Sequence, residues 1–251
     1  MKTILVTGGA GFIGSNFIKL MLYKYPKYRI INIDSLTYAG NLQNLIGIGD
    51  NENYIFIKVN IRDRRKVEEV FSSYEIDSVV NFAAESHVDR SIEEPEIFLT
   101  TNIIGTEVML DVAKKYWKIN TEDKCCKEYK SGVKFIQVST DEVYGALGKT
   151  GMFKETMPLL PNSPYSASKA SADMIVRAYH ETFGIPINIT RCSNNYGPYQ
   201  FPEKLIPLII NNCLNEKELP VYGDEMQIRD WLHVSDHCIA IDTVLHKGVV
   251  G

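Results

Sequence analysis

Two adjacent acids, Asp141 and Glu142, follow an apolar run in the segment QVSTDEVYG, residues 137–145. Two carboxyl groups whose pKa values are pushed apart by their surroundings can act as one acid and one base. A carbonyl compound with a hydroxyl on its β-carbon requires such a pair, because the proton on the α-carbon becomes acidic and the hydroxyl can then leave as water. Each proton transfer of this kind is typically worth about 10² to 10⁴ in rate. The pair therefore indicates elimination of water beside a carbonyl.

Consecutive residues of a regular strand point to opposite faces, so the two acids converge only if the strand ends before Asp141 and the backbone turns. Gly145 follows closely and is compatible with such a turn. The alternative interpretation is a solvated turn in which neither acid has a chemical task.

A second pair, Tyr165 and Lys169 in PYSASKA, is spaced by four residues and therefore shares one face of a predicted helix. An ammonium beside a phenol lowers the pKa of the tyrosine and makes it a usable base for an alcohol proton. Thr140 adds a hydroxyl at a strand end between this pair and the amino terminus. Together these residues indicate oxidation of an alcohol, although the same spacing also occurs by chance on surface helices.

The segment VTGGAGFIGS places Gly8, Gly11 and Gly14 directly after a predicted strand and at the opening of a helix. Glycines there permit a tight turn and a close approach of the backbone to a pyrophosphate. Asp34 stands 20 residues after Gly14, at the end of the second predicted strand. A carboxylate there accepts hydrogen bonds from ribose hydroxyls and repels a 2′-phosphate, which favours NAD over NADP. The alternative for Asp34 is an acid that only terminates the strand.

Short β-branched runs alternate with segments of helical spacing, such as Phe17, Leu20 and Met21. We expect strands at residues 3–7, 29–34, 55–60, 78–83, 134–139 and 187–191, and an exposed loop at 118–132. This alternation predicts an α/β fold with a Rossmann-type doubly wound parallel sheet, whose ligands lie at the carboxyl ends of the strands. From residue 193 the chain is rich in Asn, Gly, Pro and Tyr, which predicts an NAD-binding domain over 1–192 and a smaller, incomplete substrate-binding lobe over 193–251, interleaved with it.

The composition excludes several classes of function. A net charge of −4 and a pI near 5.8 argue against a nucleic-acid partner, and no apolar run is long enough for a membrane partner. Five cysteines without a zinc-ligand spacing indicate free thiols in a reducing cytoplasm. His233 and His237 lie four residues apart but have no third ligand spaced for a metal, so no metal is expected.

The segments STDEVYG, NFAAESHVDRSIEEP, PYSASKASAD, RCSNNYGPYQFPEKLIP and RDWLHVSDH resemble the extended short-chain dehydrogenase/reductase family, in particular its sugar-nucleotide 4,6-dehydratases. The resemblance runs along the whole chain and implies NAD-dependent conversion of dTDP-glucose to its 4-keto-6-deoxy product, on the way to dTDP-rhamnose and other deoxysugars. It implies that Tyr165 is the base for the alcohol and that Lys169 holds it. By the same resemblance Glu142 abstracts the C5 proton and Asp141 protonates the departing C6 hydroxyl, with Thr140 bonded to the reacting hydroxyl.

The resemblance also implies the binding residues. For NAD these are Gly8, Gly11, Phe12, Ile13, Gly14, Asp34, Ser35, Leu36, Thr37, Asn60, Ile61, Ala83, Ala84, Ser86, Thr101, Tyr165, Lys169 and Asn195. For the sugar nucleotide they are Ser86, His87, Thr140, Asn194, Lys204, Leu205, Pro220, Tyr222 and Arg229. A homodimer is implied through helices near 102–116 and 165–183, with Leu110, Val112, Ala113, Ile175, Ala178 and Tyr179 as candidates that could equally pack on the sheet.

Three departures accompany the resemblance. Asn60 stands where many relatives have Asp, and Glu225 stands where Gly is usual. The chain ends at HKGVVG, earlier than its relatives, so we expect a truncated protein whose substrate site lacks a segment. Two alternatives remain open: a dehydratase for UDP-glucose, since the catalytic triplet reads only the hexose, and an NAD-binding protein without catalysis.

Overall fold

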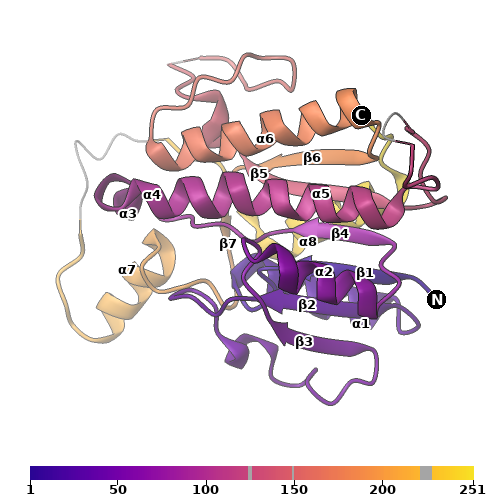
Figure 1. Cartoon of the computed structure of the whole chain (residues 1–251). Helices are drawn as coiled ribbons and strands as arrows, with labels where there is room; N and C mark the ends of the chain where they lie inside the picture. The colour runs from indigo at the N-terminus through magenta and orange to yellow at the C-terminus, as the bar shows by residue number, and fades with distance from the viewer. Residues whose placement is uncertain (124–125, 149, 221–227) are drawn as a thin grey trace.

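A parallel sheet of six strands forms the centre of the protein in the computed structural model, which describes residues 1–123, 126–148, 150–220 and 228–251 (Figure 1). The strand order is β3-β2-β1-β4-β5-β6. The strands are β1 (Thr3–Thr7), β2 (Arg29–Asp34), β3 (Tyr54–Lys58), β4 (Ser78–Asn81), β5 (Lys134–Thr140) and β6 (Ile187–Cys192). The order reverses between β1 and β4, and a ligand crevice is expected at such a point. The predicted α/β class and all six strands are confirmed.

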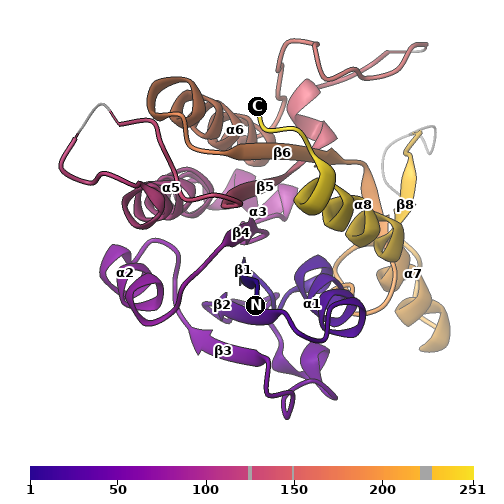
Figure 2. The same ribbon diagram turned by 90° about the vertical axis from the view of Figure 1, so that its right-hand side faces the viewer.

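Helices cover both faces of the sheet (Figure 2). One face packs on α1 (Phe12–Lys24) and α8 (Val234–Lys247), and the other on α2 (Arg64–Ser73), α5 (Gly105–Trp117) and α6 (Pro164–Phe183). Alternate strand residues point to opposite faces, so Ile4 and Leu5 lie in different apolar clusters although both are fully buried. Burial on both faces explains why the strands are nearly continuous apolar runs.

Two strand ends differ from the predicted ranges by two residues. β4 ends at Asn81 instead of residue 83, because the amide of Ala83 donates to the side-chain hydroxyl of Thr7 (3.1 Å) rather than to a neighbouring strand. β3 ends at Lys58 instead of residue 60, and Asn60 accepts a hydrogen bond from the amide of Arg62 (3.0 Å) in the turn that follows. Both turns bring backbone to the carboxyl edge of the sheet.

The remaining elements lie along that edge. They are η1 (Leu42–Leu45), α3 (Val88–Glu93), α4 (Pro95–Phe98), the π-helix η2 (Leu99–Ile104), η3 (Asp141–Tyr144), β7 (Asn194–Tyr196), α7 (Leu205–Leu214) and β8 (Trp231–His233). β7 and β8 pair in a separate two-stranded sheet, and α7 projects away from the main sheet (Figure 1). α8 then returns to cover the main sheet. The boundary at 192 and 193 stays a prediction.

The candidate dimer residues divide between core and surface. Leu110, Val112 and Ala113 are fully buried in the cluster between α5 and the sheet, so they are not available to a second subunit. Ala178 is exposed. The four cysteines that the structure describes are free thiols. No helix within the described ranges is long and apolar enough to cross a membrane.

Candidate active site

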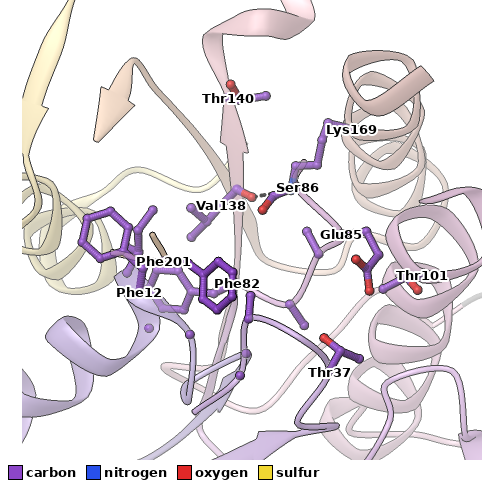
Figure 3. Close-up of a pocket in the computed structure, with 18 of the residues that line it drawn as sticks. Phe12, Thr37, Phe82, Glu85, Ser86, Thr101, Val138, Thr140, Lys169 and Phe201 are labelled. Atoms are coloured by element: carbon purple, nitrogen blue, oxygen red, sulfur yellow. Dashed lines mark hydrogen bonds between the residues drawn. The ribbon is translucent and has the colours of Figure 1, made fainter. Parts of the chain in front are cut away.

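A cavity of about 340 Å³ opens at the carboxyl edge of the sheet, and Figure 3 shows Thr37, Phe82, Glu85 and Thr140 around it. Most of the predicted site residues line this cavity. They are Gly8, Gly11, Phe12, Ile13, Gly14, Asp34, Ser35, Thr37, Asn60, Ile61, Ala83, Ala84, Ser86, Thr101, Thr140, Asp141, Glu142, Tyr165, Lys169, Asn194, Asn195 and Lys204. The structure thus brings these residues together in one cavity, and their individual roles stay predictions.

Five predicted residues do not line the cavity, namely Leu36, His87, Leu205, Pro220 and Arg229. Tyr222 and Glu225 lie outside the described residues. Leu36 is partly buried and packs against the apolar cluster that contains α1. His87 caps α3 by accepting a hydrogen bond from the amide of Arg90 (3.3 Å). Its role in substrate binding stays a prediction, as do those of Leu205 and Pro220.

The glycine-rich loop brings bare backbone against the cavity. Gly8 has φ +68°, and a Cβ there would lie 2.8 Å from the amide nitrogen of Ala83. A Cβ on Gly14 would overlap the carbonyl oxygen of Gly8. No side chain caps the first turn of α1. Its backbone amides and the positive end of the helix dipole therefore suit a phosphate group.

Asp34 does more than terminate β2. Its carboxylate accepts from the amide of Ala10 (2.9 Å) and from the amide of Leu36 (2.8 Å), so it ties the glycine-rich loop to the loop after β2. Burial raises its pKa, while the two backbone hydrogen bonds act in the opposite direction. A carboxylate has about four acceptor positions. Asp34 can therefore hold both amides and still accept from a ribose at the cavity wall.

The two acids lie in the turn that follows β5. The strand ends at Thr140, and the chain continues as the short helix η3 before Gly145, which has φ +86°. The hydroxyl of Thr140 accepts from the amide of Glu142 (3.2 Å) and bonds the carboxylate of Asp141 (3.3 Å). The turn that the sequence required is thus present, and both carboxylates line the cavity. Their chemical roles stay predictions.

The surroundings of the two carboxylates differ. Burial raises the pKa of Asp141, against a hydrogen bond from Thr140 and the charge of Arg229. Glu142 opens onto the cavity and is exposed there, yet burial of its carboxylate among protein atoms raises its pKa, and the charge of Asp141 raises it further. Lys204 and Arg229 oppose this shift at Glu142. Both groups therefore hold a proton to higher pH than an ordinary acid.

Tyr165 and Lys169 are both buried on the first turns of α6. A capping box fixes this helix start, because Ser163 accepts from the amide of Ser166 (3.1 Å) and Ser166 accepts from the amide of Ser163 (3.0 Å). The ammonium of Lys169 donates to the carbonyl of Val138 (2.7 Å), which lies on β5 two residues before Thr140. The pair is therefore positioned by a rigid helix end against β5.

The predicted effect of Lys169 on the pKa of Tyr165 is not found. Burial raises the pKa of Tyr165 well above its ordinary value, and the charge of Glu142 raises it further, while a hydrogen bond with Thr140 opposes the shift. Burial lowers the pKa of Lys169. The sequence showed the spacing of the two residues but not that the acids of the same site would oppose ionisation of the phenol.

Several residues that support the site escaped the sequence analysis. Asn102, in the π-helix η2, accepts from the amide of Glu85 (2.9 Å) and donates to the hydroxyl of Ser168 (2.8 Å). Ser168 donates in turn to the carbonyl of Tyr165 (2.7 Å). This chain of bonds fixes α6 relative to the loop after β4. No spacing in the sequence signals it, because its members lie 17 and 66 residues apart.

Other wall residues escaped notice for the same reason. They include Ala39, Gly40, Arg62, Glu85, Val138, Ser139, Cys192, Gln200, Phe201 and Glu203. Val138, Ser139 and Cys192 lie within the last residues of β5 and β6, and the others lie in loops. Asn60, one of the residues predicted to bind NAD, turns its carbonyl oxygen to Arg62 (3.0 Å to the amide and 3.2 Å to Nε). Among the residues that the structure describes, no three His, Cys, Asp or Glu side chains are grouped to hold a metal.

Two basic residues, Lys204 and Arg229, and the amide of Asn195 belong to the surroundings of the two acids. The ammonium of Lys204 donates to the carbonyl of Ser86 (3.1 Å) and so joins the start of α7 to the loop after β4. The side chain of Arg229 is exposed and bonds the carbonyl of Ile228 (2.9 Å), yet its charge still acts on both acids. Asn195 bonds the buried ring of His237 (2.9 Å). Cations and amides thus surround a site with two carboxylates.

Comparisons with known proteins agree with this geometry. The family described as GDP-mannose 4,6 dehydratase matches residues 5–250. The dTDP-glucose 4,6-dehydratase of Xanthomonas campestris pv. campestris (strain B100) is 54% identical over 251 residues, which is 100% of this chain and 70% of the relative. The crystal structure of dTDP-glucose 4,6-dehydratase from Bacillus anthracis in complex with NAD has 55% identity and a TM-score of 0.88, covering 100% of this chain and 73% of that one. The Streptomyces venezuelae dTDP-glucose 4,6-dehydratase, also with NAD bound, has 46% identity and a TM-score of 0.90 over 99% of this chain and 73% of that one.

The fold, the glycine-rich loop and the Tyr165–Lys169 pair define a dinucleotide-dependent enzyme of the extended short-chain dehydrogenase/reductase class. Within this class, the adjacent acids after β5 and the relatives at 54 to 55% sequence identity indicate one family. The chain belongs to the dTDP-glucose 4,6-dehydratase family. It spans about 70% of the length of the curated relative that it matches.

Proposed function

We propose that this chain carries out the NAD-dependent 4,6-dehydration of dTDP-glucose. One observation carries the proposal: Thr140, Asp141 and Glu142 share a cavity with Tyr165 and Lys169, and the glycine-rich loop lines that same cavity. An alcohol dehydrogenase needs one base, whereas this site adds two acids with raised pKa values. The additional pair suits the elimination of water.

The first step is oxidation at C4. Tyr165, held by the fixed start of α6 and hydrogen-bonded to Thr140, takes the proton of the C4 hydroxyl. NAD, when bound along the glycine-rich loop and Asp34, would supply the acceptor for the C4 hydride and the donor for C6. Lys169 donates to the carbonyl of Val138 (2.7 Å) and so holds the start of α6, with Tyr165, against β5.

The second step removes water across C5 and C6. Glu142 takes the C5 proton, which the C4 carbonyl has made acidic, and Asp141 protonates the C6 hydroxyl as it leaves. Burial favours the protonated form of Asp141, while the hydrogen bond from the hydroxyl of Thr140 (3.3 Å) acts in the opposite direction; we assign Asp141 the acid role from the resemblance to the family. The two roles thus require different protonation states of neighbouring carboxyls.

The third step completes the cycle. The hydride that left C4 returns to C6, and Glu142 gives its proton back to C5, so the sugar becomes a 4-keto-6-deoxyglucose. The proton that Tyr165 took passes through solvent to Asp141. No net oxidation occurs, and one water leaves.

We assign the nucleotide part of the substrate to the basic side of the cavity. Lys204 lies on the wall and Arg229 lies near enough for its charge to act on both acids. A guanidinium and an ammonium suit a diphosphate. Asn194 and Ser86 also line the cavity and would bind the hexose hydroxyls. We retain Pro220 and Tyr222 as proposed contacts of the nucleotide.

We further propose a cytoplasmic homodimer that feeds deoxysugar synthesis such as the rhamnose pathway. Exposed apolar side chains support the dimer: Ile104 at the end of η2 is 51% exposed and Met174 on α6 is 57% exposed. η2, α5 and α6 lie against one another on one face of the protein (Figure 1). A second copy packed there would cover this apolar surface.

To test the proposal, dTDP-glucose with deuterium at C4 is incubated with the protein and NAD, and the position of the deuterium in the sugar is followed. We expect loss of one water and deuterium at C6, without free NADH. A parallel incubation with UDP-glucose shows whether the protein prefers thymine or uracil in the nucleotide. Bound NAD without a keto product would support the non-catalytic alternative and contradict the proposal.

Two matched variants separate the acids. E142Q should oxidise C4 and then stop, so reduced cofactor accumulates on the protein and overall turnover falls about 10² to 10⁴-fold. D141N should still exchange the C5 proton with solvent deuterium while losing water slowly. Equal effects of both variants on C5 exchange would contradict the separate roles.

A further inference from the structure

Three separate segments of the cavity wall meet around the ring of Tyr38. Its hydroxyl donates to the carboxylate of Glu203 (3.2 Å), and the edge of its ring faces Phe201, with 5.6 Å between ring centres. The guanidinium of Arg90 lies 4.1 Å from the centre of the same ring. His87 approaches the other oxygen of Glu203 at 3.7 Å. We call Tyr38, Arg90, Phe201 and Glu203 the rim clasp.

The rim clasp joins parts of the wall that follow different strands, β2, β4 and β7. Tyr38 lies in the loop after β2, between the lining residues Thr37 and Ala39. Arg90 lies in α3, just beyond the lining segment after β4. Phe201 and Glu203 line the wall between β7 and α7. Phe201 lies next to Phe12 of the glycine-rich segment (Figure 3), so the clasp joins the loops after β2 and β4 to the segment before α7 at the cavity wall.

Tyr38 makes a hydrogen bond to a carboxylate, an aromatic contact and a cation–π contact. Burial, with the charges of Glu203 and Glu85, raises the pKa of Tyr38 to about 12, so its hydroxyl remains a donor at all working pH values. A hydrogen bond to a carboxylate is about twice as strong as a neutral one. An arginine over the ring and an edge-on phenylalanine add to it. The site machinery described above uses none of these contacts.

The proposed reaction gives such a clasp a task. A dehydrogenase can release its reduced cofactor after each turnover, whereas here the hydride must return to the same sugar. We propose that Tyr38 is a positioning residue that, through Glu203, keeps the reduced nicotinamide cofactor in the cavity until the hydride returns. This inference rests on the proposed function. The residue touches no reacting atom and acts by holding the wall segments together.

The direct test measures the release rate of the cofactor from the binary complex, without sugar nucleotide. Protein loaded with NADH is mixed with excess NAD, and the fluorescence of bound NADH is followed. Y38F removes only the hydroxyl and keeps the ring, so we expect release about ten-fold faster, the loss of one charged hydrogen bond. Y38A should release faster still. Y23F is the matched control, because Tyr23 is 89% exposed.

The outcome is independent of turnover. Equal release rates in Y38F, Y38A and the unaltered protein overturn the inference, whether or not the protein dehydrates dTDP-glucose. A Y38A variant with a lower melting temperature but an unchanged release rate overturns it as well, because the residue is then only structural. Failure of the deuterium transfer in the unaltered protein would count against the proposed function alone.

Two further readouts bear on the partner residue. E203Q keeps an acceptor for Tyr38 but removes the charge, so we expect an intermediate release rate. If E203Q raises KM for the sugar nucleotide and leaves cofactor release unchanged, Glu203 binds substrate and the inference is wrong. During turnover, Y38F should leak free NADH and lose activity with time, and added NAD should restore it.

Discussion

A buried histidine behind the cofactor cavity predicts how the protein responds to acid. His237 on α8 is 3% exposed, and its Nδ1 bonds the amide oxygen of Asn195 (2.9 Å). Its Nε2 is buried without a hydrogen-bond partner among the described residues. Burial lowers the pKa of His237 from 6.5 to about 4. The ring is therefore neutral in the folded protein, with the proton on Nδ1.

The sign of the effect follows from where each state takes up the proton. Above pH 6.5 neither the folded nor the unfolded chain protonates His237, so this residue has no influence on the pH dependence there. Between pH 6.5 and about 4 only the unfolded chain binds the proton, so the free energy of unfolding falls as the pH falls. At about 1.36 kcal/mol per unit, the gap corresponds to roughly 3 kcal/mol.

The assay is urea unfolding of the unaltered protein and of H237Q at pH 7.5 and pH 4.5. Glutamine can still donate to Asn195 but does not titrate. We expect H237Q to be less stable at pH 7.5, because it packs less well, and the unaltered protein to lose about 2 to 3 kcal/mol more than H237Q on acidification. Parallel losses in the two proteins would refute the buried neutral ring.

Two further substitutions test the cofactor site. D34A leaves the buried amides of Ala10 and Leu36 without their acceptor and should cost about 1 to 3 kcal/mol for each in urea unfolding. D34N keeps one acceptor and should lower the preference for NAD over NADP roughly ten-fold in binding assays, since a like charge is removed. An undiminished preference would show that Asp34 does not face the ribose. G14A should abolish NAD binding and lower stability by about 1 to 3 kcal/mol, because its Cβ overlaps the carbonyl of Gly8, whereas G11A, with its nearest contact at 3.2 Å, should do so only mildly.

The strands and the location of the site were predictable because both depend on local patterns. A strand buried on two faces must be apolar throughout, and polar residues directly after such a run must lie at the carboxyl edge. Asp34, Thr140 and the glycine-rich loop were found in this way. The same pattern did not decide whether Leu110 packs on the sheet or on a second subunit, because either surface buries an apolar helix face.

The features that the sequence did not show depend on contacts between distant segments. Glu203 lies 165 residues from Tyr38, and Asn102 lies 66 residues from Ser168. Neither residue type nor spacing predicts such a pair. The prediction of a lowered pKa for Tyr165 was wrong for a related reason. The spacing to Lys169 is local, whereas the burial and the charge of Glu142, which raise the pKa, come from the tertiary structure.

The parallel sheet and the Tyr165–Lys169 pair on α6 suit the oxidation of an alcohol in general. The short turn after β5 decides which reaction follows that oxidation. η3 spans four residues, and the next residue, Gly145, has φ +86°, with a Cβ that would overlap the carbonyl of Leu160. The amide of Leu160 donates back to the carbonyl of Val143 (3.0 Å). This close approach fixes the turn against the segment before α6. Two adjacent acids are thereby held at one wall of the cavity, where a regular strand would have directed them to opposite faces.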